Sequence, residues 1–284
     1  MRDGYFDSDD GLSLYFREHI VPGARAHALV VHGVSEHYGR YRWVEERLAQ
    51  AGIGFSMMDL RGHGQSEGTR VHVDRFQQYL GDLDRFFARV EGVGAPLFLI
   101  GHSLGGLIAV RWAQTRRPLA GRLRGLITSG AALKATLKPP APVFFLLAQI
   151  NKLYSRTPLP GLVPVDKICR DPEIVRRYTT DPLVHKNLTT GFGIASMQAM
   201  QEALAEAHRI DVPALVMHGG ADALVDNSAS SELFAGLKVA DKTLKIYPNF
   251  YHELFNEPER DAVLAEVCAW MLARAGERAG ASAA

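Results

Sequence analysis

A serine between two glycines is the first feature of this sequence that could carry out chemistry. Residues 101–105 read Gly-His-Ser-Leu-Gly, with an apolar run at 97–100 before them and an apolar, helix-like segment after them. A G-x-S-x-G pattern between a strand and a helix is typical of a nucleophile elbow, a tight turn that exposes a serine at the tip of a sheet. The pattern predicts that Ser103 is a nucleophile. It also requires an acid and then a histidine, each in a loop after a later strand.

Both required partners follow in that order. Asp222 comes just after the apolar run 215–217, and His252 comes just after the run 243–247. A neutral imidazole can take the proton of a serine, and a carboxylate fixes the tautomer of the imidazole and stabilises the imidazolium that forms. Asp226 is an alternative acid, but Asp222 is the first acid after its strand. We therefore predict a catalytic triad of Ser103, Asp222 and His252.

Acyl transfer also needs N–H donors for the oxyanion that develops on the substrate. Leu104 stands at the start of the predicted helix, where N–H groups have no acceptor within the helix. The second donor is expected in the loop after the strand 29–31, where residues 32–34 read His-Gly-Val. We expect the main-chain N–H groups of Val34 and Leu104 to form the oxyanion hole.

The elements that must position these residues alternate between strand and helix. Residues 4–20 predict a hairpin, and unbroken apolar runs such as 28–31 are typical of parallel strands that are covered on both faces. We expect an α/β fold with a mostly parallel, doubly wound sheet, whose ligand lies at the carboxyl ends of the strands. Residues 130–205 contain eight prolines and no clear strand. They predict a helical cap inserted into a core formed by residues 1–129 and 206–284.

Composition excludes several classes of function. The 284 residues include 32 Lys and Arg and 31 Asp and Glu, for a formal net charge of +1, so nucleic acid is not an expected partner. Cys169 and Cys268 match neither a metal cluster nor a disulfide framework. No stretch reaches the ~18 apolar residues of a membrane span, and the N-terminal residues lack the apolar core of a signal peptide. We expect a cytoplasmic protein, and the oligomeric state stays open.

The glycine-rich loops do not predict a cofactor. Residues 61–66 do not match a Walker A loop, and no G-x-G-x-x-G follows the first parallel strand. His32 and His37 have no carboxylates at the spacing of a metal site. We expect neither a cofactor nor a metal.

Several motifs together resemble the monoacylglycerol lipase family of the α/β-hydrolase superfamily, a group that includes lysophospholipases. They lie at residues 32–41, 59–68, 101–106, 181–183 and 241–247. The resemblance implies an α/β-hydrolase fold and the cleavage of monoacylglycerols, or similar single-chain lipid esters, to fatty acid and alcohol through an acyl-enzyme. It implies the same triad and the same oxyanion donors that the spacing and order of the residues predict.

The resemblance also implies a binding site for the alcohol part of the substrate. Glu36, Arg40 and Tyr178 match positions that shape the polar end of the site in the family, although a salt bridge between Glu36 and Arg40 that orients the loop is an equal alternative. Mammalian members have a second histidine where this chain has Phe255, and a reactive cysteine where it has Val225. The alcohol end is therefore expected to be less polar here.

The cap contains a run, 143–147, that is apolar on nearly all sides of a helix. We expect Phe144 and Leu147 to line an acyl tunnel, and the cap to touch lipid surfaces peripherally. A helix simply packed on the core is the alternative.

Other functions are compatible with a serine triad. A lysophospholipase or a broad carboxylesterase would use the same residues. A family S33 aminopeptidase would want an acidic cluster in the cap for the substrate amine, and this cap has a basic balance. The alternative from a different class of function is a receptor-like protein with the hydrolase fold, which binds a small ligand and turns it over slowly.

Overall fold

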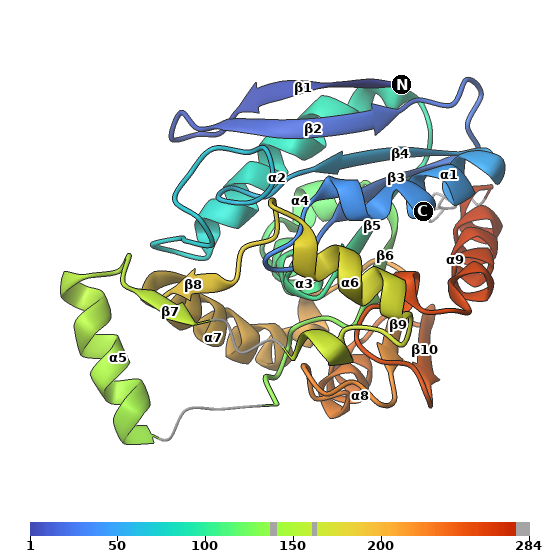
Figure 1. Cartoon of the computed structure of the whole chain (residues 1–284). Coiled ribbons are helices and arrows are strands. Elements are labelled where there is room, and N and C mark those ends of the chain that lie inside the picture. Colours follow the sequence, from blue (N-terminus) through green and yellow to red (C-terminus); the bar gives the residue numbers. More distant parts are fainter. Residues whose placement is uncertain (137–140, 161–163, 277–284) are drawn as a thin grey trace, which may run out of the picture.

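An eight-stranded sheet forms the centre of the molecule (Figure 1). The computed structural model describes residues 1–136, 141–160 and 164–276. The strand order is β1-β2-β4-β3-β5-β6-β9-β10. The strands are β1 (Arg2–Asp7), β2 (Ser13–His19), β3 (Ala26–Val31), β4 (Ile53–Met58), β5 (Leu97–His102), β6 (Leu123–Ser129), β9 (Ala214–Gly219) and β10 (Lys242–Tyr247). β1 pairs with β2 and β2 pairs with β4 in the antiparallel sense, and the other neighbouring pairs are parallel. The predicted hairpin and the mostly parallel sheet are both confirmed.

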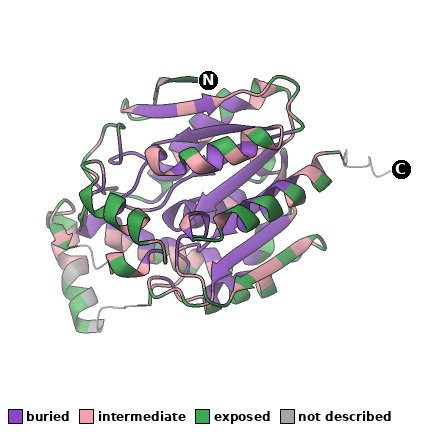
Figure 2. Cartoon of the chain, turned by 45° about the vertical axis from the view of Figure 1, so that its right-hand side comes forward, coloured by how far each residue is buried: buried purple, intermediate pink, exposed green. Residues whose placement is uncertain are grey.

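The apolar runs of the sequence are the central strands, because every residue of β3, β4, β5 and β9 is buried (Figure 2). Successive side chains of a strand point to opposite faces. Leu29 and Val31 therefore join the apolar cluster on one face, and Ala28 and Val30 join the cluster on the other. Both faces need a layer of helices to exclude water.

Two helices cover one face and several cover the other. α1 (Arg42–Gln50) and α9 (Arg260–Ala275) pack on the face of Ala28, and α2 (Gln77–Val90), α3 (Leu104–Thr115) and α8 (Ser228–Gly236) pack on the face of Leu29. The remaining helices outside the cap are short: α4 (Arg117–Ala120) and the 3-10 helices η1 (Tyr38–Tyr41), η2 (Glu91–Val93), η4 (Ala207–Arg209) and η5 (Leu254–Asn256). This arrangement is a doubly wound α/β sandwich, as predicted.

The segment between β6 and β9 interrupts the alternation once. It contains α5 (Ala141–Leu153), β7 (Pro158–Pro160), η3 (Val165–Lys167), α6 (Pro172–Thr180), β8 (Asn187–Thr189) and α7 (Thr190–Ala205). α5 lies at the outer edge of the molecule alongside α7 (Figure 1). Phe192, Ala195 and Ala199 of α7 join the main apolar cluster. This helix therefore packs directly on the core.

The expectation of no strand in this segment is wrong at one place. β7 and β8 form a small antiparallel sheet, with Leu159 opposite Leu188. Each strand has three residues, and prolines flank Leu159, so neither strand shows the alternating pattern that marks a strand in a sequence.

Candidate active site

Ser103 occupies a sharp turn between β5 and α3. Its backbone has φ 51° and ψ −116°, a strained conformation for a residue with a side chain. Space for the turn depends on glycine, because a Cβ on Gly101 would lie 2.3 Å from the carbonyl oxygen of Gly105, and a Cβ on Gly105 would lie 2.0 Å from that of Val31. The N–H of Ser103 donates to the carbonyl of Ser129 at 3.0 Å, which fixes the turn against β6. This is the geometry of a nucleophile elbow.

Asp222 and His252 meet beyond the ends of β9 and β10. Nδ1 of His252 lies 2.7 Å from Oδ2 of Asp222. The other oxygen of Asp222 accepts from the N–H groups of Leu224 and Val225 at 2.8 and 3.0 Å. Asp226, the alternative acid, instead contacts Ser228 and Lys134 near the surface. The structure therefore pairs Asp222 with the histidine.

A second histidine supports this carboxylate. Nε2 of His218 lies 3.0 Å from Oδ2 of Asp222, and its Nδ1 lies 2.7 Å from the hydroxyl of Ser230. Burial of Asp222 raises its pKa, but His252 and these hydrogen bonds outweigh burial and hold the pKa well below its usual range. The carboxylate is therefore charged whenever the histidine needs a counter-charge.

The same pair sets the protonation of His252. Burial disfavours the charged ring, yet the charge and hydrogen bond of Asp222 outweigh it and raise the pKa of His252 above its ordinary value. Because Nδ1 donates to Asp222, the neutral ring carries its lone pair on Nε2. The ring of His102 lies 4.9 Å from that of His252, and burial lowers the pKa of His102 to about 4. A neutral neighbour does not oppose an imidazolium at His252.

Several of the candidate residues line one cavity. Its walls come from the loop after β3, the elbow, the cap and the two loops after β9 and β10: Gly33, Val34, Glu36, His102, Ser103, Ile168, Tyr178, Leu224, His252 and Glu253. A Cβ on Gly33 would lie 3.1 Å from Cβ of Ser103, so the main chain leading to Val34 passes beside the nucleophile. Leu104 begins α3 directly after Ser103. Val34 thus lines the same cavity as Ser103 and Leu104 adjoins the serine in the chain, while their role as oxyanion donors stays a prediction.

His32 anchors this loop through both of its ring nitrogens. Its Nδ1 lies 2.7 Å from the carbonyl of Gly33, and its Nε2 accepts from the N–H of Leu60 at 2.9 Å. Burial lowers its pKa to about 3. Within the part of the chain that the structure describes, no group of three or more His, Cys, Asp or Glu side chains could hold a metal ion.

A second cavity adjoins the first and shares Val34 and Tyr178 with it. It lies under the cap and is lined by Val34, Ser35, Val165, Tyr178, Thr179, Val184, His185, Lys186 and Leu188. Four of these residues have aliphatic side chains. This space could receive an apolar part of a substrate whose reacting carbon lies at Ser103.

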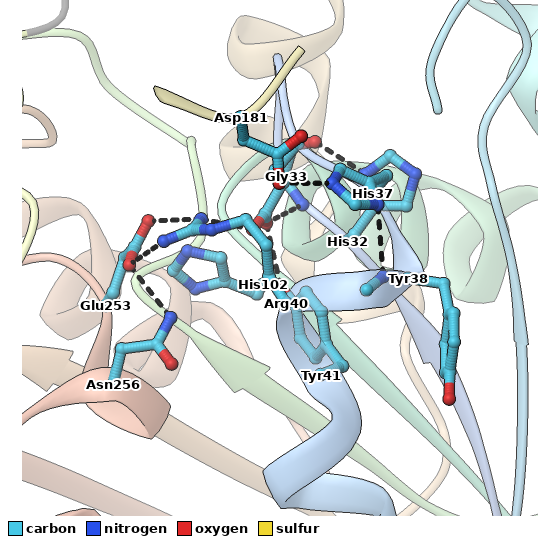
Figure 3. A network of polar contacts seen from close by, with 12 residues as sticks. His32, Gly33, His37, Tyr38, Arg40, Tyr41, His102, Asp181, Glu253 and Asn256 are labelled. Carbon is cyan, nitrogen blue, oxygen red and sulfur yellow. Dashed lines mark hydrogen bonds and ion pairs between the residues drawn. The ribbon is translucent and has the colours of Figure 1, made fainter. Parts of the chain in front are cut away.

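Glu36 and Arg40 meet in a buried ion cluster, of which Figure 3 labels Arg40 and Glu253. Nη1 of Arg40 lies 2.6 Å from Glu36, and the guanidinium lies 4.7 Å from the ring centre of Tyr178. Arg40 also binds both carboxylate oxygens of Glu253, at 2.7 and 2.6 Å. The sequence reasoning missed Glu253. The only hint in the sequence is that an acid directly follows the predicted catalytic histidine. The structure supplies the reason for that acid, because the buried guanidinium of Arg40 needs counter-charges.

Among the other expected substrate residues, the structure describes the side chain of Phe255. Phe255 is buried in η5 and joins the apolar cluster of α1 and α9, and it also lines a small pocket with Arg40, His102 and Glu253. The side chains of Phe144 and Leu147 lie outside the described part of the structure, and their role stays a prediction.

Ser103 stands on a sharp turn after a strand of a mostly parallel sheet. Its acid and then its histidine follow in loops beyond two later strands. This arrangement defines an α/β-hydrolase. A family model described as serine aminopeptidase, S33, matches residues 22–259. The chain belongs to this family, and within it to the group of monoacylglycerol lipase-like α/β-hydrolases. The predicted α/β-hydrolase fold and family are confirmed.

Individual relatives support this placement. A monoacylglycerol lipase of Mycolicibacterium smegmatis is 35% identical over 256 residues, which cover 87% of this chain and 88% of that protein. The phospholipase YtpA of Bacillus subtilis is 30% identical over 237 residues, covering 83% and 90%. The crystal structure of a monoacylglycerol lipase from Paleococcus ferrophilus superposes with a TM-score of 0.84 at 33% identity, covering 92% of this chain and 99% of that one.

Proposed function

We propose that this protein is a serine ester hydrolase that cleaves monoacylglycerols to fatty acid and glycerol. The observation that carries the proposal is the 2.7 Å pair of His252 and Asp222 beside Ser103 on its strained turn, in a cavity that adjoins an apolar space under the cap. The similarity to monoacylglycerol lipases over most of the chain supports the substrate class.

The reaction follows from the roles of the three side chains. Oγ of Ser103 attacks the ester carbonyl while Nε2 of His252 takes the hydroxyl proton, and Asp222 stabilises the imidazolium. The N–H groups of Val34 and Leu104 bind the oxyanion, and loss of one such donor typically costs about 3–4 kcal/mol of barrier. His252 then donates its proton to the leaving alcohol. Water attacks the acyl-enzyme by the same route and releases the fatty acid.

The charges around the site favour an ester over a peptide amine. The two acids that line the cavity at Ser103, Glu36 and Glu253, are both paired with Arg40. An aminopeptidase has to bind the ammonium group of its substrate with a free carboxylate, and neither of these two is free. The family name therefore does not carry over to the substrate.

The cap has two further roles in this proposal. Residues 130–205 act as a lid over the core, and the exposed apolar side chains of α5 and its C-terminal end contact lipid surfaces; they are Val143, Phe145, Leu146, Leu153 and Tyr154. Among the residues described, no helix is long and apolar enough to cross a membrane. Cys169 and Cys268 are both free thiols, which supports a location of the protein in the cytoplasm, at a membrane surface.

A hydrolysis panel tests the proposed function. Purified protein is assayed with monoacylglycerols of several chain lengths, lysophospholipids, p-nitrophenyl esters and aminoacyl p-nitroanilides. We expect the highest kcat/KM with a monoacylglycerol and no release of p-nitroaniline, and folded Ser103→Ala should lose the activity. A lysophospholipid or an anilide as the best substrate would contradict the proposal.

A further inference from the structure

Glu253 links the loop of the catalytic histidine to its surroundings on two sides. It directly follows His252, and its N–H donates to the carbonyl of Ile168 in the cap at 2.8 Å. Its buried side chain turns toward Arg40, which binds it through two parallel hydrogen bonds (Figure 3). Bidentate pairs of this kind fix geometry as well as charge. The orientation of Arg40 is therefore tied to the histidine loop.

Arg40 carries this link to the opposite wall of the cavity. Its Nη1 donates to Oε2 of Glu36 at 2.6 Å. The other oxygen of Glu36 accepts from the N–H of Gly33 at 2.6 Å and from the hydroxyl of Tyr41 at 2.8 Å. Gly33 directly precedes Val34. An unbroken series of charge-assisted hydrogen bonds thus runs from the residue after the base to the residue before the oxyanion donor.

We propose that Glu253 is a positioning residue, which sets the main chain of Gly33 and Val34 relative to His252 through Arg40 and Glu36. The proposal rests on the proposed function only in the roles given to His252 and Val34. Glu253 lines the cavity at Ser103, but in this scheme it acts through Arg40 and needs no contact with the substrate. It holds two parts of the site, which are distant in sequence, in one rigid arrangement.

Burial makes the link stiff. Glu36, Arg40 and Glu253 expose 3%, 9% and 6% of their side chains, so each charge depends on its partners in the cluster. Removing one member leaves an uncompensated buried charge and forces the others to rearrange. If Glu253 lost its charge, Arg40 would keep one carboxylate and could follow Glu36. Gly33 would then move with the acceptor of its N–H, and a shift of about 1 Å at a reacting centre can cost on the order of a hundredfold in rate.

The charges near the base give a second readout. His252 faces Asp222, Glu253, Glu36 and the neutral ring of His102, and each of the three carboxylates raises its pKa. Glu253→Gln removes one of these carboxylates. The acid limb of the pH profile of kcat/KM should move to lower pH, whereas a general loss of stability would leave it in place.

Labelling of Ser103 with a fluorophosphonate tests the link without relying on any ester substrate. Oγ of Ser103 forms a bond to phosphorus, fluoride leaves, and His252 takes the serine proton. We expect Glu253→Gln to slow labelling about tenfold or more, because the phosphoryl oxygen needs the oxyanion donors. KM for a monoacylglycerol should change far less than kcat. Glu18→Gln is the matched control, since Glu18 is a buried carboxylate that Arg2 and Arg89 contact at the far edge of the sheet.

A double variant tests the coupling through Arg40. Contacting members of one network do not lose activity additively. We expect Glu253→Gln combined with Arg40→Met to lose no more than the worse of the two single variants. Additive losses would overturn the proposal, as would wild-type labelling by folded Glu253→Gln.

The outcome stays informative if one variant fails to fold. Glu36→Gln breaks the same link from the other end and keeps an acceptor for Gly33, so wild-type labelling by this variant also overturns the proposal. A wild-type protein that is labelled rapidly but hydrolyses no monoacylglycerol would contradict the proposed substrate alone, and the effect of Glu253 would still be measured.

Discussion

Asp222 holds His252 by a 2.7 Å contact to Nδ1 and shares the same oxygen with His218 at 3.0 Å. A carboxylate with two histidines on one oxygen and two main-chain N–H groups on the other has little freedom to rotate. Its position therefore fixes the plane of the His252 ring. This rigidity makes Asp222 the residue on which the orientation of the base depends.

Replacement of Asp222 by Asn should abolish most activity without unfolding the protein. The amide keeps the shape but supplies no charge for the imidazolium, and it favours the wrong tautomer of His252, so we expect kcat to fall by about a thousandfold or more. Asp226→Asn is the control because Asp226 lies near the surface and contacts Ser228 and Lys134. Steady-state hydrolysis of a p-nitrophenyl ester measures both. Equal losses in the two variants would mean that the acid is assigned wrongly.

The activity should also fall at low pH, as His252 becomes protonated. Only the neutral form of His252 can accept the serine proton, and Asp222 raises its pKa. Activity is then present above this pKa and is lost as the pH falls through it, at a value above the ~6.5 of a free imidazole. The pH dependence of kcat/KM reports the pKa of the free enzyme. An acid limb that lies below the ordinary imidazole value would contradict the role of Asp222.

The pattern of the sequence predicted the parts of the site that depend on local geometry. An elbow needs glycine on both sides of the serine, and the acid and the base have to follow strands, so Ser103, Asp222 and His252 could be found by type, spacing and order. Unbroken runs of apolar residues likewise predicted the parallel strands, because helices cover both faces of such strands and exclude water.

The parts that depend on long-range pairing were not predictable in this way. Glu253 acquires its role from Arg40, which lies 213 residues earlier in the chain, and no local pattern joins the two. Phe255 lies in the 3-10 turn after His252, which places it both in the apolar cluster of α1 and α9 and on a small pocket beside Arg40, and no local pattern shows this double position. β7 and β8 are too short for a periodic pattern and are defined only by pairing with each other.

The glycines of the elbow should be intolerant of even a methyl group. A Cβ on Gly105 would lie 2.0 Å from the carbonyl oxygen of Val31 and 2.6 Å from that of His32, and these backbone atoms cannot move without shifting β3. We expect Gly105→Ala to lower the free energy of unfolding by about 3 kcal/mol or more, the upper end of overpacking costs. Gly92→Ala is the matched control, because a Cβ there meets no atom within 4 Å. Thermal unfolding followed by circular dichroism compares the two, and equal midpoints would contradict the prediction.

Exposed apolar side chains on α5 should decide how the protein binds lipid. Phe145 and Leu146 are 66% and 59% exposed at the outer edge of the cap. Moving a Phe or Leu side chain from water into an apolar phase gains about 1.5–3 kcal/mol each. Phe145→Ser combined with Leu146→Ser should therefore reduce the fraction of protein that sediments with phosphatidylcholine vesicles by about tenfold or more.

Tyr5→Ser is the control, since Tyr5 is 55% exposed on β1, far from the cap in sequence and in space (Figure 1). Hydrolysis of a dissolved p-nitrophenyl ester should stay unchanged in all variants, because the loss concerns contact with the lipid surface and leaves the chemistry at Ser103 intact. Unaltered vesicle binding by the double variant would show that α5 is not the lipid-contacting surface.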